Sequence, residues 1–90
     1  MQVELLVASW CSSCRRAEDI WTRICARHGI GLEILDLETP PGEAVARKHH
    51  LNIMPAVLID GHPRAVGVQT EPEAEALLLV ALKLSSDASR

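Results

Sequence analysis

The chain has 90 residues, of which 48% are hydrophobic and 23% charged, and its formal net charge is −3. This length supports one hydrophobic core and is too short for two, and the composition is that of a folded domain rather than a disordered chain. The lysines and arginines are scattered along the sequence, which argues against a nucleic-acid partner. Two tryptophans are the only aromatic residues, so we expect a core of Leu, Val, Ile and Ala.

The first part of the chain predicts a strand, a helix and a second strand. Residues 3–8 form an apolar run of strand length, and residues 32–37 form another that a Thr-Pro-Pro-Gly segment ends. Between them lies a helix that Gly29 ends, and one face of it holds Ala17, Ile20, Trp21, Ile24, Cys25 and His28. A helix between two strands is typical of a βαβ unit with parallel strands.

The second part predicts a short helix over residues 43–49, a strand over 56–59, a turn over 60–63 and an antiparallel strand over 64–66. Thr70 and Glu73 have the spacing of a capping box, so the last helix begins there and runs to about Leu84. The order is therefore β-α-β-α-β-β-α in one domain, residues 1–84, followed by a polar tail, residues 85–90.

Cys11 and Cys14 lie where the first strand gives way to the helix. Free N–H groups and the helix dipole at such a position favour a thiolate, which makes Cys11 the activated sulfur. Cys14 is expected one turn inside the helix and close enough to form a disulfide with Cys11. The sequence thus offers an attacking thiol and a resolving thiol together.

A zinc or iron–sulfur site is the alternative use of this pair, and it needs further ligands. Cys25 lies about 16 Å farther along the same helix, too far to share one mononuclear site with Cys14. Its place on the apolar face predicts a buried, inert thiol. His49 and His50 end a helix, where capping is favoured and one of them is expected in a left-handed conformation. Redox use is therefore favoured, with no metal and no cofactor.

Side chains near the thiols have alternative interpretations. Trp10 is expected as an exposed plate for substrate, whereas Trp21 is expected in the core. Arg15 and Arg16 oppose the helix dipole in the first turn, and both thiolate stabilisation and plain solvation remain open for them. The apolar run over residues 77–82 is compatible with a homodimer contact, but a monomer is favoured.

The Trp-Cys-Ser-Ser-Cys segment after the first strand, together with Met54-Pro55 before the third, resembles the thioredoxin superfamily in its smallest form. The chain is most similar to small glutaredoxin-like thioredoxins called redox-active disulfide proteins, in which Ile-Asp-Gly follows the proline, as at residues 59–61. The resemblance implies an α/β fold with a four-stranded mixed sheet flanked by three helices. It also implies a cis Pro55 against the disulfide, backbone groups of Met54 for an extended substrate, and Gly67 beside an open groove.

Two features depart from the family pattern. Thioredoxins have a buried Asp in the first strand that helps to move the proton of the second cysteine, and here the corresponding place falls near Leu5. The residues between the thiols, Ser12 and Ser13, match none of the family's usual pairs. The motif therefore assigns no redox direction.

We expect a thiol–disulfide oxidoreductase in which Cys11 and Cys14 are the catalytic pair. The expected substrate is a disulfide-bearing protein or small thiol, the electron donor a thioredoxin reductase or glutathione, and no membrane is involved. Because three cysteines include only one motif pair and the N-terminus lacks a basic segment, the protein is expected in the cytoplasm, where reduction is the favoured direction. The alternatives are a glutathione-linked glutaredoxin, a soft-metal-binding or partner-binding module, and a scaffold with a vestigial dithiol.

Overall fold

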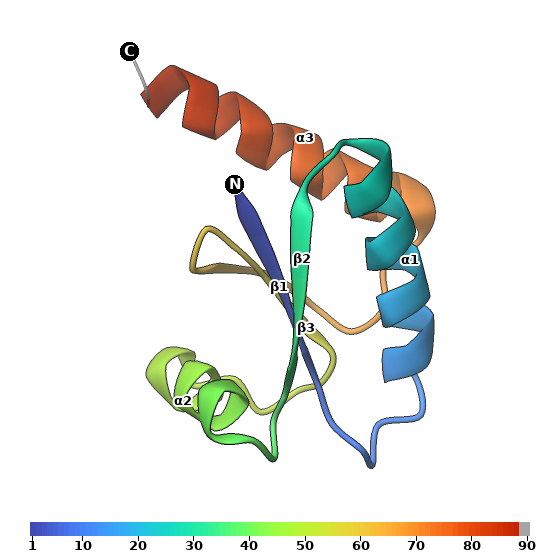
Figure 1. Cartoon of the computed structure of the whole chain (residues 1–90), viewed down its shortest axis with the longest axis vertical. Helices are drawn as coiled ribbons and strands as arrows, with labels where there is room; N and C mark the ends of the chain where they lie inside the picture. Colours follow the sequence, from blue (N-terminus) through green and yellow to red (C-terminus); the bar gives the residue numbers. More distant parts are fainter. Residues whose placement is uncertain (89–90) are drawn as a thin grey trace.

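A computed structural model describes residues 1–88 and contains a mixed sheet with helices on both faces (Figure 1). The elements in chain order are β1 (Gln2–Val7), α1 (Cys14–Arg27), β2 (Gly31–Asp36), α2 (Pro40–His49), β3 (Ala56–Ile59), β4 (His62–Val66) and α3 (Glu71–Ala88). The predicted order and fold class are therefore confirmed. Among residues 1–88, no helix has the length and apolar character that crossing a bilayer requires.

The sheet has the strand order β2-β1-β3-β4, so β1 and β3 are central. β1 pairs with β2 in parallel, as the βαβ pattern predicts, while β3 is antiparallel to both β1 and β4. Helices α1 and α3 cover one face of the sheet and α2 covers the other (Figure 1). Because both faces are covered, β3 is apolar and buried along its whole length, and β1 is apolar from Leu5 to its end.

Alternate side chains of β1 pack on opposite faces of the sheet. Val3 and Leu5 belong to the core under α1 and α3, whereas Leu6, and Ala8 just beyond the strand, belong to the core under α2. The indole of Trp21 is wholly buried in the first of these cores, as predicted. The end of β1 therefore lies between two packed layers.

Hydrogen bonds across helix ends fix α3 against α1. His28, just after α1, contacts Glu75 at 2.8 Å, and Arg27 contacts the same carboxylate at 3.4 Å. The hydrogen bond with His28 and the charge of Arg27 lower the pKa of Glu75. The predicted capping box is confirmed, because the Thr70 N–H donates to Glu73 Oε1 at 2.8 Å and the Glu73 N–H donates to Thr70 Oγ1 at 3.3 Å.

Three boundaries differ by two residues or more from the sequence prediction, and β1 and β2 each lie one residue earlier than expected. α2 begins at Pro40 rather than at residue 43, because proline fits the first helical positions, whose N–H groups need no partner in the helix. The hairpin turn is only Asp60 and Gly61, both at positive φ, so β4 begins at His62. α3 continues past Leu84 to Ala88, since no glycine or proline follows to end it, and residues 89–90 of the expected tail lie outside the described residues.

His50 has a left-handed backbone conformation at the end of α2, as expected for one of the two histidines.

Gly42 lets α2 approach the end of β2. It is buried in the first turn of α2, and a Cβ atom there would overlap the backbone carbonyl of Asp36. The close contact places α2 beside the carboxyl end of β2, which is next to the carboxyl end of β1. A side chain at residue 42 would therefore push the helix away from this end.

We expect Gly42→Ala to lower the free energy of unfolding by about 1–3 kcal/mol, because the new methyl group overlaps backbone that cannot rotate away. Helix propensity alone predicts the opposite sign, a gain of about 0.5–1 kcal/mol. Denaturant unfolding of the two proteins measures the difference. A stabilised variant would contradict the close approach.

Candidate redox site

Cys11 lies in the loop between β1 and α1, and Cys14 begins α1. The Cys11 N–H donates to the carbonyl of Ala8 at 3.1 Å, and the Cys14 N–H donates to the carbonyl of Cys11 at 3.4 Å. The first helical hydrogen bond follows, from the Ala17 N–H to the carbonyl of Ser13 at 3.2 Å. Cys14 is thus the first residue of α1, and its expected place one turn inside the helix is wrong, because a separate turn closes before the helix starts.

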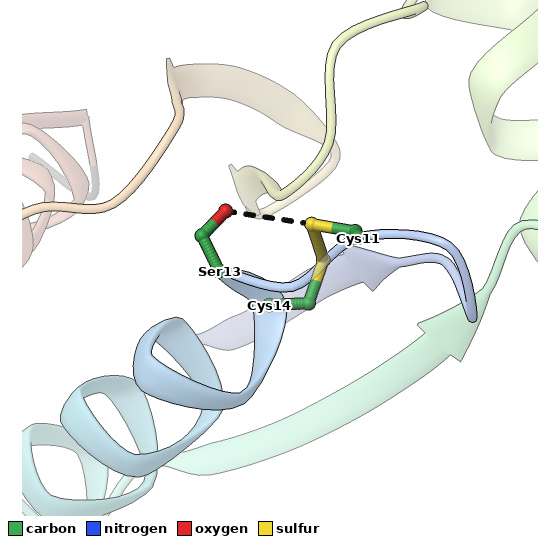
Figure 2. The surroundings of a disulfide bond; sticks show 3 residues. All are labelled: Cys11, Ser13 and Cys14. Carbon is green, nitrogen blue, oxygen red and sulfur yellow. Dashed lines mark hydrogen bonds between the residues drawn. A yellow bond between two sulfur atoms is a disulfide. The ribbon is translucent and has the colours of Figure 1, made fainter.

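Cys11 and Cys14 are joined by a disulfide, with 5.5 Å between their Cα atoms (Figure 2). Cys14 is only 4% exposed and packs in the core under α2, whereas Cys11 is half-buried at the edge of that core. A molecule approaching from solvent therefore reaches the sulfur of Cys11 first.

The charges around the disulfide favour an anion. The first turn of α1 contains no acidic residue, and the exposed side chains of Arg15 and Arg16 lie in it. The N-terminal end of α1 adds the positive end of the helix dipole. Positive charge at such a position generally favours a thiolate over a thiol.

Met54, Pro55 and Gly67 lie together beside this loop. The Met54-Pro55 peptide bond is cis, as the resemblance implies, and Met54 is buried in the same cluster as Cys14. The Gly67 N–H donates to the carbonyl of Pro55 at 2.8 Å. Gly67 has a φ of +80°, and a Cβ atom there would meet nothing within 4 Å, so open space lies beside it.

Trp10 is the remaining residue that the sequence assigned to the site. Its indole is 65% exposed and directly precedes Cys11 in the loop. Among the described residues, no hydrogen bond joins it to Met54, Pro55 or Gly67. The structure therefore connects five of the six assigned residues through bonds or packing contacts. Trp10 is outside this group, and its indole faces solvent.

A family model for the thioredoxin domain matches residues 1–79. The chain belongs to the thioredoxin domain family. Its sequence has no match among curated proteins.

Solved thioredoxins have the same fold. Thioredoxin 1 from Thermosipho africanus is 19% identical, with a TM-score of 0.75 over 96% of this chain and 99% of that chain. Thioredoxin-2, described as a component of the malaria parasite protein secretion machinery, is 22% identical, with a TM-score of 0.72 over 88% and 81%. Oxidised thioredoxin O2 from Arabidopsis thaliana is 19% identical, with a TM-score of 0.65 over 92% and 73%. At these identities the likeness establishes the fold.

Within this thioredoxin domain, Gln69 connects the helical core to the Gly67 loop. Its side-chain oxygen accepts a hydrogen bond from the indole nitrogen of Trp21 at 3.1 Å. Its side-chain nitrogen donates to the carbonyls of Gly67 at 3.1 Å and Val66 at 3.3 Å. The amide thus fixes the backbone that lies next to Pro55. Nothing in the sequence pattern singles out Gln69, because a lone glutamine after a strand has no characteristic spacing.

The thioredoxin domain lacks a buried acid at the expected place. Leu5 is 1% exposed in the core under α1 and α3, and none of the described residues that are buried is polar or charged. Cys25 is also buried, as predicted, and burial raises the pKa of its thiol. In the described part of the chain, no group of three His, Cys, Asp or Glu residues is placed to hold a metal ion.

We expect Gln69→Leu to lower the free energy of unfolding by about 1–3 kcal/mol, because the buried indole N–H of Trp21 loses its partner. Denaturant unfolding of a double-mutant cycle with Trp21→Phe measures this. In the Trp21→Phe background there is no indole N–H to be left unpaired, so Gln69→Leu should lower the free energy of unfolding by clearly less. An equal decrease in both backgrounds would show that Gln69 does not stabilise the protein through this hydrogen bond.

Proposed function

We propose that this protein is a thiol–disulfide oxidoreductase that reduces disulfides with Cys11 as the attacking thiol and Cys14 as the resolving thiol. The observation that carries the proposal is the unequal burial of a bonded pair: Cys11 is half-buried just before the N-terminus of α1, and Cys14 is only 4% exposed. The more accessible sulfur is suited to attack a substrate. A buried partner is suited to react only within the molecule.

The reaction proceeds in two exchanges. In the first, the Cys11 thiolate attacks one sulfur of the substrate disulfide, forms a mixed disulfide and releases the other substrate sulfur as a thiolate. In the second, Cys14 loses its proton and attacks the Cys11 sulfur, which releases the second substrate sulfur and forms the Cys11–Cys14 bond. Two electrons pass from the protein to the substrate, and a donor must return them. A thioredoxin reductase or glutathione is the proposed donor.

Among the described residues no carboxylate is buried that could accept the proton of Cys14, and the place of the acid in thioredoxins falls near the apolar Leu5. We propose that the departing substrate thiolate or solvent takes this proton. Resolution should then be slower than in thioredoxins that have the acid, and it should accelerate as pH rises.

The substrate is proposed to be an extended peptide segment bearing a disulfide. Met54 and Pro55 are buried, so backbone rather than side-chain groups are available for recognition beside the sulfurs. The open space at Gly67 leaves room for a second backbone, and the exposed indole of Trp10 offers an apolar contact on the Cys11 side. Net reduction is proposed because one motif pair among three cysteines is typical of a reducing compartment.

Substituting each thiol separately tests the two roles. Cys11→Ser should abolish reduction of a protein disulfide such as that of insulin, because no attacking thiol remains. Cys14→Ser should instead stop after the first exchange and accumulate a mixed disulfide on Cys11, detectable by intact mass. Cys25→Ala is the matched control, and its turnover should equal that of the wild type because that thiol is buried. Equal residual turnover in the first two variants would contradict the assigned roles.

A further inference from the structure

Ser13 has the position of a helix cap but does not use its side chain as one. It is the N-cap residue of α1, where a serine oxygen normally accepts a hydrogen bond from a backbone N–H of the first turn. Its side chain makes no such bond, and its backbone is helical, at φ −86° and ψ −10°, rather than extended. The hydroxyl is therefore directed elsewhere.

The hydroxyl points at the sulfur that is proposed to react. Ser13 Oγ lies 3.5 Å from Cys11 Sγ, within hydrogen-bonding distance for a sulfur acceptor (Figure 2). In the disulfide, Cys11 Sγ has no hydrogen, so the hydroxyl of Ser13 is the donor. A disulfide sulfur is a weak acceptor, whereas a thiolate is a charged one.

We propose that Ser13 is a positioning residue that stabilises the Cys11 thiolate through its hydroxyl, an inference that rests on the proposed function. Reduction of the disulfide takes up two electrons and one proton, leaving Cys11 as a thiolate and Cys14 as a thiol. The hydrogen bond from Ser13 strengthens in that reduced state because its acceptor has become an anion. Ser13 thereby raises the fraction of reactive thiolate and makes the pair a stronger oxidant than it would otherwise be.

Other charged groups near the sulfur stay the same when Ser13 is changed. Arg15 and Arg16 lie in the first turn of α1, and Glu38, after β2, accepts a hydrogen bond from Ser9 in the same loop. The cluster against which Cys11 packs is apolar apart from the thiol of Cys14. A difference between wild type and a Ser13 variant therefore reports the hydroxyl itself.

Titration of the thiolate absorbance tests the inference directly. In a Cys14→Ser background, where Cys11 is the remaining thiol of the pair, Ser13→Ala should raise the midpoint of the titration by about one pH unit, a tenfold loss of thiolate below the midpoint. Ser13→Thr keeps a hydroxyl and should restore the wild-type midpoint. Ser12→Ala removes a hydroxyl from the exposed neighbour and should leave the midpoint unchanged.

Redox equilibrium with glutathione separates this role from a structural one. In the chain with both thiols, Ser13→Ala should shift the equilibrium about tenfold toward the disulfide at pH values above its own midpoint, or about 30 mV for two electrons. Below the wild-type midpoint the two proteins should coincide, because Cys11 is then a thiol in both. A merely structural role would move the equilibrium equally at every pH.

Unchanged midpoints, or a shift that does not depend on pH, would overturn the inference. Both measurements need only the Cys11–Cys14 pair and no protein substrate. A wild-type protein that reduces no protein disulfide would therefore overturn the proposed function while leaving this inference to stand or fall on its own result.

Discussion

The burial of β1 on both faces is the constraint on which the site depends. The second half of β1 is apolar on each side and lies between two layers of helices, so its carboxyl end lies where the core under α1 and α3 meets the core under α2. The loop that leaves this end returns as α1, and the first residue of the helix is Cys14. One cysteine is therefore fixed by packing, while the other remains in the loop within reach of solvent.

The same packing gives the two thiols different accessibility, and none of the described residues in the core is charged. Burial keeps Cys14 from external partners, and the half-buried Cys11 lies next to the positive end of the α1 dipole. The segments that complete the site come from farther along the chain. Pro55 and Gly67 are joined by a backbone hydrogen bond, and Gln69 ties that pair to Trp21 in the core. The backbone at Pro55 and Gly67 is thus tied to α1, the helix that begins at Cys14.

The sequence predicted most of the fold, because its main signals are local. The apolar runs of β1 and β3, the apolar face of α1 and the capping box of Thr70 and Glu73 each depend on residues close together in the chain. Helix starts were less predictable, since prolines are compatible with both a loop and a first helical turn, and α2 begins at Pro40. Individual side-chain contacts had no signal in the sequence. The Gln69 bonds and the use of Ser13 on Cys11 rather than on the helix depend on side-chain directions that spacing does not encode.

A redox titration of the wild-type protein in glutathione and dithiothreitol buffers tests the central claim, that Cys11 and Cys14 form an exchanging rather than a structural disulfide. Thiol alkylation followed by mass measurement reports the number of free thiols at each potential. We predict a reversible two-electron transition between about −270 and −200 mV, the range of thioredoxins and glutaredoxins. A disulfide that stays oxidised to below about −300 mV, as structural disulfides do, would contradict the claim.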